Sequence, residues 1–364
     1  MARVLVAAGA SGGHVYPGLA TAEVLRAHGH TVEFVGGDRL ESRVVPDAGF
    51  AFHALPVRRP PSVRIELLTP RGIRAMGSIG WATLRAGRLL KRIRPDAVLG
   101  MGGFASVPVA LATARAKLPL VLHEQNAHLS FAQRIPLRWA RALAIGLPIE
   151  ERVEHWRIEE VGNPVRASIT ALASGGVDRT AARSALGLGA DATTVLVNGG
   201  SLGSGPLNEA VPRLRLPDGV QVLHLAGVGR EGDVRAAWAS SGTPAVVLGF
   251  CERMQDAYAA ADLAISRSGA GTVSELAIAG LPSVLIPLTT LARGDQEANA
   301  RVLERAGAAR VVLQTDPALG DRVSQEVATL VGDAALRQRM SAAARAVARP
   351  DAAERLAEVV ESVI

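Results

Sequence analysis

Glycine-rich segments that could hold phosphate groups occur four times in the chain. Each stands between an apolar run and a helix-like segment, at residues 9–13, 100–103, 199–205 and 268–271. Where such a loop leads into a helix, its backbone N–H groups and the helix dipole attract an anion. One loop is a weak indication, because glycines also serve tight turns and close packing. Four in corresponding places predict a ligand, or ligands, with several phosphates.

The spacing of the glycines disfavours two common nucleotide-binding motifs. Gly9-x-x-Gly12-Gly13 differs from the G-x-G-x-x-G of dinucleotide-binding folds, and the second apolar run ends in Gly36-Gly37 without an acid for a ribose hydroxyl. Asp38 is the nearest acid to that position. The loops also lack the lysine of a Walker A motif. A dehydrogenase and an NTPase are therefore disfavoured.

Strand-like and helix-like segments alternate along the whole chain, as they do in parallel α/β sheets. The strand candidates are residues 4–8, 32–36, 97–100 and 119–123 in the first half, and 194–198, 220–226, 245–248, 263–266 and 283–287 in the second. The helix candidates are residues 17–28, 71–94, 206–213, 272–279, 296–306 and 333–348.

The two halves of the chain also resemble each other. Residues 5–13 parallel 196–204, and residues 96–122 parallel 262–285, each as strand, glycine loop and helix. We predict an α/β fold of two doubly wound, Rossmann-like domains, residues 1–163 and 164–349, with the ligand at the carboxyl ends of the strands. An amphipathic terminal segment, residues 350–364, is expected to pack back on the first domain.

Composition excludes several classes of protein. The 364 residues are 48% hydrophobic and 20% charged, which disfavours disorder and suits two domains. A single cysteine, Cys251, allows no internal disulfide and fits a reducing compartment. The eight histidines show no metal-ligand spacing. No apolar run reaches the length of a membrane-spanning helix, so we expect a soluble or at most peripheral protein.

The positive charge is concentrated in one segment. Residues 58–94 hold ten basic side chains and one acid, a net charge of +9 in a chain whose total is +6. The rest of the chain is therefore slightly acidic. Such a local excess indicates one anionic surface partner.

The motifs around the loops resemble the MurG family of bacterial transferases, within glycosyltransferase family 28. They occur in the family's order and cover nearly the whole chain. They are Gly9-Ala-Ser-Gly-Gly-His-Val-Tyr-Pro-Gly-Leu-Ala20, Gly100-Met-Gly-Gly-Phe-Ala-Ser-Val-Pro108, His123-Glu-Gln-Asn-Ala127, Val161-Gly-Asn-Pro-Val-Arg166, Gly199-Gly-Ser-Leu-Gly-Ser204, Asn208-Glu-Ala210, Ser266-Arg-Ser-Gly-Ala-Gly-Thr-Val-Ser-Glu275 and Gln296-x-x-Asn299-Ala300.

This resemblance implies the two-domain GT-B fold, with the acceptor site in the first domain and the UDP-sugar in the second. The implied reaction transfers N-acetylglucosamine from UDP-GlcNAc to the 4-OH of MurNAc in undecaprenyl-pyrophosphoryl-MurNAc-pentapeptide, with inversion, during peptidoglycan synthesis. A related GT-B enzyme of secondary metabolism, a UDP-GlcNAc 2-epimerase and a non-enzymatic sugar-nucleotide sensor remain alternatives. An epimerase would need a pair of catalytic acids, and none is evident.

Carried over by position, the resemblance also implies the ligand contacts. Ser11, Gly12 and Gly13 would approach the sugar and phosphates, and Asn126 the GlcNAc. Arg166 and Ser201 would lie on the nucleotide side, and the backbone of Cys251 would meet the uracil. The other donor contacts would come from a phosphate-binding helix start, an acid for the ribose and two amides: Ala270, Gly271, Thr272, Val273, Ser274, Glu275, Gln296 and Asn299.

Physical chemistry supports two of these roles. Glu275 could accept two hydrogen bonds from the ribose diol, and Gln296 offers both donor and acceptor to a sugar hydroxyl. The alternative for Glu275 is a capping box with Thr272. The chain departs from the family at Leu202, at Asp295 and in residues 127–134, which lack the usual Gly-Leu-x-Asn-Arg.

The implied reaction needs a base for the hydroxyl and positive potential for the leaving diphosphate. His14 is the candidate base, because a helix N-terminus lowers the pKa of an imidazole and keeps it neutral at pH 7. Binding the acceptor pyrophosphate, or a structural hydrogen bond, remain alternatives for His14. The helix start at Gly271 and Thr272, aided by Ser201, would stabilise the diphosphate. No Asp-x-Asp pair is present, so we expect no catalytic metal and no cofactor.

The basic segment carries Ile73, Met76, Ile79, Trp81 and Leu84 among its arginines. Basic residues around exposed apolar ones suit an anionic bilayer. We therefore expect a cytoplasmic enzyme, peripheral on the inner face of the cell membrane, with a lipid-linked acceptor and no nucleic-acid partner. The alternative is an amphipathic helix that only faces the core.

Overall fold

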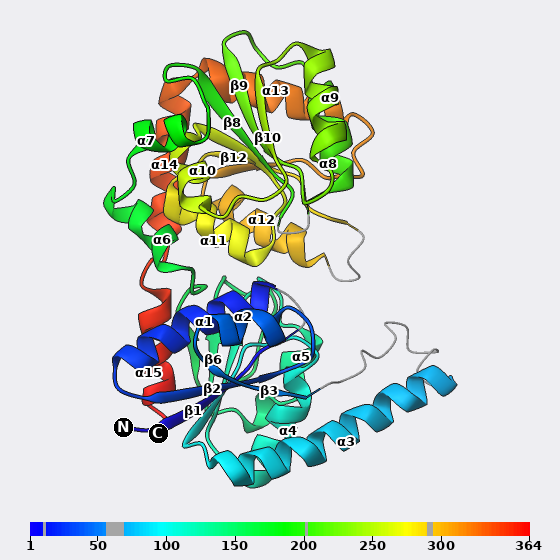
Figure 1. Cartoon of the computed structure of the whole chain (residues 1–364), viewed down its shortest axis with the longest axis vertical. Coiled ribbons are helices and arrows are strands. Elements are labelled where there is room, and N and C mark those ends of the chain that lie inside the picture. The colour runs from blue at the N-terminus through cyan, green and yellow to red at the C-terminus, as the bar shows by residue number, and fades with distance from the viewer. Residues whose placement is uncertain (10–11, 56–68, 201–202, 290–293) are drawn as a thin grey trace. The chain divides into compact units, whose positions relative to one another are not determined.

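The computed structural model describes residues 1–9, 12–55, 69–200, 203–289 and 294–364 (Figure 1), without the side chains of 70–76. The chain divides into two compact units. The first contains Met1–Arg166 and Asp351–Ile364, and the second Ala167–Pro350. The sequence placed these boundaries after residues 163 and 349.

A parallel sheet of seven strands, in the order β3-β2-β1-β4-β5-β6-β7, forms the centre of the first unit. Strands β1, β4, β5 and β6 are almost entirely buried, as parallel strands covered on both faces must be. The strands are β1 (Arg3–Ala7), β2 (Thr31–Gly36), β3 (Ala51–Ala54), β4 (Ala97–Gly100), β5 (Leu120–Glu124), β6 (Ala142–Ile145) and β7 (Ile158–Glu160).

Helices cover both faces of this sheet. Alternate residues of β1 point to opposite faces, so Val4 and Val6 join one core cluster while Leu5 and Ala7 join another. Figure 1 shows α15, in red, beside α1, in blue. The helices are α1 (Gly12–Ala27), α2 (Glu41–Asp47), α3 (Pro70–Ile93), α4 (Ser106–Ala116), α5 (Phe131–Arg134), the 3-10 turn η2 (Leu137–Trp139) and α15 (Ala352–Glu361).

The second unit contains a parallel sheet of six strands, in the order β10-β9-β8-β11-β12-β13. Its strands are β8 (Thr193–Asn198), β9 (Val220–Leu225), β10 (Ala245–Leu248), β11 (Leu263–Ser266), β12 (Ser283–Leu285) and β13 (Ala309–Val311). Its helices are α6 (Ala167–Thr170), η3 (Ala171–Ser174), α7 (Arg179–Ala185), α8 (Gly205–Ala210), η4 (Val211–Arg213), α9 (Glu231–Ser241), α10 (Met254–Ala260), α11 (Ala270–Ala279), α12 (Asp295–Arg305), α13 (Leu319–Gly332) and α14 (Ala334–Val347).

Both sheets follow the same doubly wound order, and this confirms the fold class predicted from the sequence. In each sheet the order reverses beside the first strand, between β1 and β4 and between β8 and β11. At such a reversal the two chain connections run to opposite faces of the sheet, and open α/β sheets bind their ligands there, at the carboxyl ends of the strands. The four glycine loops follow these four strands.

One helix boundary differs from the prediction in a way that affects the site. The sequence placed Pro17 at the start of a helix, where proline is favoured, but α1 begins at Gly12. Pro17 lies inside the helix and gives up one backbone hydrogen bond. His14 therefore stands in the first turn of α1 rather than in the loop before it.

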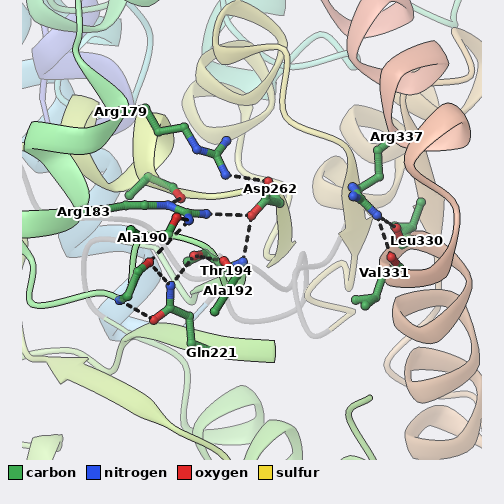
Figure 2. A network of polar contacts seen from close by, with 12 residues as sticks. Arg179, Arg183, Ala190, Ala192, Thr194, Gln221, Asp262, Leu330, Val331 and Arg337 are labelled. Atoms are coloured by element: carbon green, nitrogen blue, oxygen red, sulfur yellow. Dashed lines mark hydrogen bonds and ion pairs between the residues drawn. The ribbon is translucent and has the colours of Figure 1, made fainter. Parts of the chain in front are cut away.

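The amino ends of the strands in the second unit are held by a polar network (Figure 2). Asp262 accepts hydrogen bonds from Arg179 at 2.6 Å, from Arg183 at 2.9 Å and from the backbone N–H of Thr194 at 2.8 Å. Gln221 donates to the hydroxyl of Thr194 at 2.9 Å. These contacts join α7 to β8, β9 and β11 at the amino ends of the strands, opposite the end that carries the glycine loops.

The part of the chain that the structure describes contains neither a membrane-spanning helix nor a cluster of metal ligands. Of the helices that the structure describes, none combines the length and the apolar character needed to cross a bilayer. Within the same part of the chain, no three His, Cys, Asp or Glu side chains are grouped so that they could hold a metal ion.

Candidate functional site

The first two glycine loops contact each other where the strand order reverses in the first unit. A Cβ on Gly103 would lie 2.5 Å from the carbonyl oxygen of Gly9. Gly102 and Gly103 also have φ values of +86° and +76°, which other residues rarely adopt. The close packing and the backbone conformation therefore require glycine at these two positions, with or without a ligand. They allow the loop after β4 to pack against the loop after β1.

His14 lies across this junction. A Cβ on Gly102 would be 3.2 Å from His14 Cδ2, and one on Gly103 would be 3.6 Å from His14 Nδ1. Burial lowers the pKa of His14 to about 4, so the imidazole is neutral at pH 7. The sequence predicted this direction but attributed it to the helix N-terminus, whereas the cause is loss of solvent.

A second buried histidine stands close to His14. His123, in β5, donates from Nε2 to the carbonyl oxygen of Gly162 at 3.0 Å and accepts at Nδ1 from Gln125 at 3.1 Å. This arrangement fixes the neutral tautomer with the proton on Nε2. Burial is the main cause that lowers the pKa of His123 to about 4; the hydrogen bond to Gly162 opposes this effect and the neighbouring His14 adds to it. Both imidazoles are therefore neutral at pH 7.

Two glutamines hold the second loop in place. Gln125 Nε2 donates to the carbonyl oxygen of Met101 at 2.7 Å. Gln133 Nε2 donates to the carbonyl oxygens of His123 at 2.7 Å and Gly100 at 3.3 Å. Sequence reasoning missed both residues. Gln125 could have been found inside the His-Glu-Gln-Asn motif, whereas Gln133 lies in the segment that departs from the family.

Glu124 orients Asn126, one of the predicted sugar contacts. The backbone N–H and the side-chain Nδ2 of Asn126 donate to Glu124 Oε1 at 3.0 and 3.1 Å, and Ser130 N–H donates to Oε2 at 2.8 Å. Burial raises the pKa of Glu124, and these hydrogen bonds offset part of that effect. The amide nitrogen of Asn126 is therefore fixed toward the protein.

The remaining predicted residues of the first unit lie near the start of α1. Gly12 and Gly13 are its first two residues, and a Cβ on Gly12 would touch the ring of Tyr16 at 3.1 Å. The guanidinium of Arg166 lies 5.8 Å from the centroid of that ring. Ser11 lies outside the described residues.

In the second unit, the first turn of α11 has backbone N–H groups that find no partner within the helix. Gly269 caps the helix, and the N–H of Val273 is the first to bond within it, to the carbonyl oxygen of Gly269 at 2.9 Å. The N–H groups of Ala270, Gly271 and Thr272 therefore have no partner inside the helix, which suits a phosphate. Val273 is fully buried, and the hydroxyl of Ser274 donates to the carbonyl oxygen of Ala270 at 3.0 Å.

Glu275 projects one and a half turns into α11 and is oriented by another side chain. The phenol of Tyr258 donates to Glu275 Oε2 at 2.8 Å. The capping alternative is wrong, because Gly269 and not Thr272 is the N-cap. Tyr258 was missed, since nothing in its spacing from Glu275 signals the contact.

Gln296 is held by its oxygen. Its Oε1 accepts from the backbone N–H of Leu288 at 2.9 Å and of Ser268 at 3.4 Å. In the part of the chain that the structure describes, Nε2 has no acceptor, so Gln296 would meet a hydroxyl as a donor and not in both senses. Asn299 is fully buried and donates to the carbonyl oxygen of Ser268 at 3.2 Å, so its side chain supports the loop.

Arg267 and Asn208 secure the two loops of the second unit, and neither was assigned a role from the sequence. Arg267 bonds Ser204 Oγ from Nε at 3.1 Å and from Nη2 at 2.9 Å. Asn208 donates to the carbonyl oxygen of Ala226 at 2.8 Å and accepts from His224 Nε2 at 3.1 Å. His224 is fully buried, and this lowers its pKa to about 4.

Cys251 is buried and lines an open cavity of about 820 Å³ between the segment after β10 and helices α6 and α7. Phe250, Arg253 and Asp256 contribute to the same wall. Ser201 and Leu202 lie outside the described residues. Asp295 is the first residue of α12.

Comparison with known proteins gives two family matches. Residues 4–145 match the glycosyltransferase family 28 N-terminal domain, and residues 194–356 match the glycosyltransferase family 28 C-terminal domain. A relative from Halorhodospira halophila is 42% identical over 99% of this chain and 98% of its own length. It is named UDP-N-acetylglucosamine–N-acetylmuramyl-(pentapeptide) pyrophosphoryl-undecaprenol N-acetylglucosamine transferase.

Two solved structures bear on the fold. The crystal structure of Acinetobacter baumannii MurG is 29% identical, with a TM-score of 0.78 over 99% of both chains. A UDP-N-acetylglucosamine 2-epimerase from Listeria monocytogenes has a TM-score of 0.67 over 99% of this chain and 96% of its own, at 16% identity. The second likeness therefore shows the fold alone.

Proposed function

This chain belongs to glycosyltransferase family 28, and on that premise we propose that it transfers N-acetylglucosamine from UDP-GlcNAc to lipid-linked MurNAc-pentapeptide in peptidoglycan synthesis. The observation that carries this function is the 42% identity to a transferase of that name, spread over both units. The GT-B fold agrees with it, with two doubly wound domains.

The reaction we propose is a direct displacement with inversion. The 4-OH of MurNAc attacks the anomeric carbon of UDP-GlcNAc, the bond to the diphosphate breaks, and UDP leaves with that electron pair. The hydroxyl proton must go to a base, and the negative charge that grows on UDP must be stabilised. The sequence has no Asp-x-Asp pair that could chelate a catalytic metal, and we propose that the reaction uses neither metal nor cofactor.

His14 is the base in this proposal. It is neutral at pH 7 and lies on the junction of the first two loops. A pKa of about 4 makes the imidazole a weak base, but the negative charge of an acceptor pyrophosphate beside it would raise that value. Gly12, Gly13 and Asn126, with Ser11, would bind the sugar and phosphates around it.

The donor would bind in the second unit. The N–H groups of Ala270, Gly271 and Thr272 would hold its diphosphate, with Ser201 nearby. Glu275, oriented by Tyr258, would accept hydrogen bonds from the ribose, and Gln296 Nε2 would donate to a sugar hydroxyl. The backbone of Cys251 would meet the uracil, and Arg166 would lie on the nucleotide side.

Helix α3 supports contact with an anionic membrane. Its inner face packs on α4 and joins the core through Ala82, Ala86 and Leu90. Trp81 and Leu84 are 50% and 64% exposed on the outside, with Arg85 over the ring of Trp81 and four further exposed basic residues along the last turns, Arg88, Lys91, Arg92 and Arg94. Ile79 is half-buried, and the side chains of Ile73 and Met76 lie outside the described part. We place the enzyme on the cytoplasmic face of the cell membrane.

One assay tests this function. The protein is incubated with UDP-GlcNAc labelled in the sugar and with an undecaprenyl-pyrophosphoryl-MurNAc-pentapeptide acceptor. Label in the lipid product, with UDP released in equal amount, is the expected result. Label that stays on the nucleotide as a 2-epimer, or binding without turnover, would contradict it. Transfer to a small aromatic or polyketide acceptor in preference to the lipid would favour secondary metabolism instead.

A further inference from the structure

Two buried arginines in the second unit have opposite electrostatic surroundings. Arg183 and Arg267 are each only 4% exposed. Arg183 lies at the amino ends of the strands and pairs with Asp262 at 2.9 Å (Figure 2). Arg267 lies at the carboxyl ends, directly after β11, and among the described residues no carboxylate pairs with it.

Every described hydrogen-bond partner of Arg267 is neutral. Its Nε and Nη2 donate to Ser204 Oγ, and its Nη1 donates to the carbonyl oxygen of Ile286 at 2.8 Å. A small cavity of about 20 Å³ adjoins it, lined by apolar side chains and by Gln314, which carries no charge. Burial lowers the pKa of Arg267, but a guanidinium stays protonated at neutral pH.

A buried charge without a counter-ion is strongly unfavourable, so its presence calls for an explanation. For Arg183 the explanation is Asp262, whose charge works against the lowering of the Arg183 pKa. For Arg267 the protein supplies no such acid. An anionic ligand bound close by would compensate the charge.

The position of Arg267 indicates which ligand this is. Ser204, which it bonds, ends the third glycine loop, and Ser268, which follows it, begins the fourth. The backbone N–H of Arg267 also donates to the carbonyl oxygen of Asn198, at the end of β8. Arg267 thus ties together the two loops at the reversal of strand order, beside the unpaired N–H groups of α11.

We propose that Arg267 is a positioning and electrostatic residue for the donor diphosphate. It holds the third and fourth glycine loops in register, and its buried charge attracts the diphosphate across the fourth loop without contacting it. The same charge stabilises UDP as the bond to the sugar breaks. This inference rests on the proposed donor site and adds a residue to it.

The test compares ligands with and without phosphate. In R267Q the charge is removed while an amide donor remains for Ser204 or Ile286. We expect the Kd for UDP to rise about tenfold or more, as for a buried charge several ångströms away, and the Kd for uridine to stay within about twofold of wild type. We also expect kcat to fall further than donor saturation explains, because the charge on UDP is largest in the transition state.

R183Q is the matched control, because Asp262 keeps Arg179 as a partner. We expect it to lower thermal stability and leave the ratio of the two Kd values unchanged. R267M serves as a second neutral variant if R267Q does not fold. A purely structural role for Arg267 would weaken UDP and uridine equally, or neither, and that result would overturn the inference.

The proposed function and the inference about Arg267 can fail independently of each other. If wild-type protein shows no transfer but binds UDP with the same dependence on Arg267, the function is wrong and this inference stands. If wild-type protein transfers the sugar and the ratio of Kd values is the same in R267Q, the inference alone is wrong.

Discussion

The phenol of Tyr258 and the carboxylate of Glu275 form a 2.8 Å hydrogen bond between α10 and α11. The bond fixes the carboxylate toward α10 and leaves Glu275 able to accept further hydrogen bonds. Tyr258 is 2% exposed, so it acts on a ligand through Glu275 rather than directly.

Y258F tests this relationship. Loss of one hydrogen bond to a charged group should weaken UDP-GlcNAc binding about 5- to 20-fold. A donor made from 2′-deoxyuridine should lose less, because it lacks one hydroxyl for Glu275. Isothermal titration of both donors measures the effect. In a double-mutant cycle, Y258F with E275Q should cost no more than E275Q alone, and additive losses would refute the coupling.

H14Q should lower kcat by about 10²- to 10⁴-fold, the range that removal of a general base produces. The KM for UDP-GlcNAc should change little, because His14 is not among the proposed donor contacts. H28Q is a control with the same change at a surface histidine, which bonds Glu361 in α15. Near-normal turnover of H14Q would show that His14 is not the base.

The stability of the protein should fall as the pH falls from about 6.5 to about 4. His123 and His224 are fully buried with pKa values of about 4, below the unfolded value of 6.5. Between these values the unfolded chain binds more protons, so protonation favours unfolding. Each shift corresponds to about 3 kcal/mol at its limit, present above pH 6.5 and lost progressively down to pH 4.

Urea unfolding at pH 7 and pH 4.5 measures this effect. Trp238 is the only tryptophan of the second unit and donates from Nε1 to His224 Nδ1 at 3.0 Å, so its fluorescence follows that unit. H224Q should lose the part of the pH dependence that this signal reports. If H224Q and wild type lose the same free energy of unfolding between pH 7 and pH 4.5, the pKa of His224 in the folded protein must be close to its unfolded value.

The double change W81S/L84S should reduce sedimentation with vesicles rich in anionic lipid by about tenfold, since two exposed apolar side chains leave the bilayer surface. Turnover of a water-soluble acceptor analogue should stay the same, because neither residue belongs to the site. V228S is the control, since Val228 is 77% exposed in the second unit. Binding that survives W81S/L84S but disappears at high salt would assign the attraction to the basic residues alone.

The sequence predicted the parts of this protein that depend on local pattern. Apolar runs and glycine loops located both sheets, and their repetition gave the doubly wound order. Short strands such as β7 and β13 were missed, because three residues carry too little periodicity. The start of α1 was wrong because Pro17 imitates a first helical position.

The sequence likewise predicted only part of the candidate site. Motifs identified the residues that would face a ligand, such as His14, Glu275 and Gln296. The side chains that hold them, such as Gln133, Tyr258 and Arg267, come from positions whose proximity only the folded chain creates. The burial that lowers the pKa of His14, and the neutral surroundings of Arg267, are likewise properties of the whole folded unit.

The return of α15 to the first unit has a consequence for the order of folding during synthesis. Leu356, Ala357 and Val360 fill the core beneath α1, and Glu361 bonds both His28 and His30. A ribosome delivers these residues only after the entire second unit. The unit whose synthesis begins first therefore cannot complete its core until the second unit has been made, and a chain that stops before residue 351 leaves an apolar surface on it for chaperones to recognise.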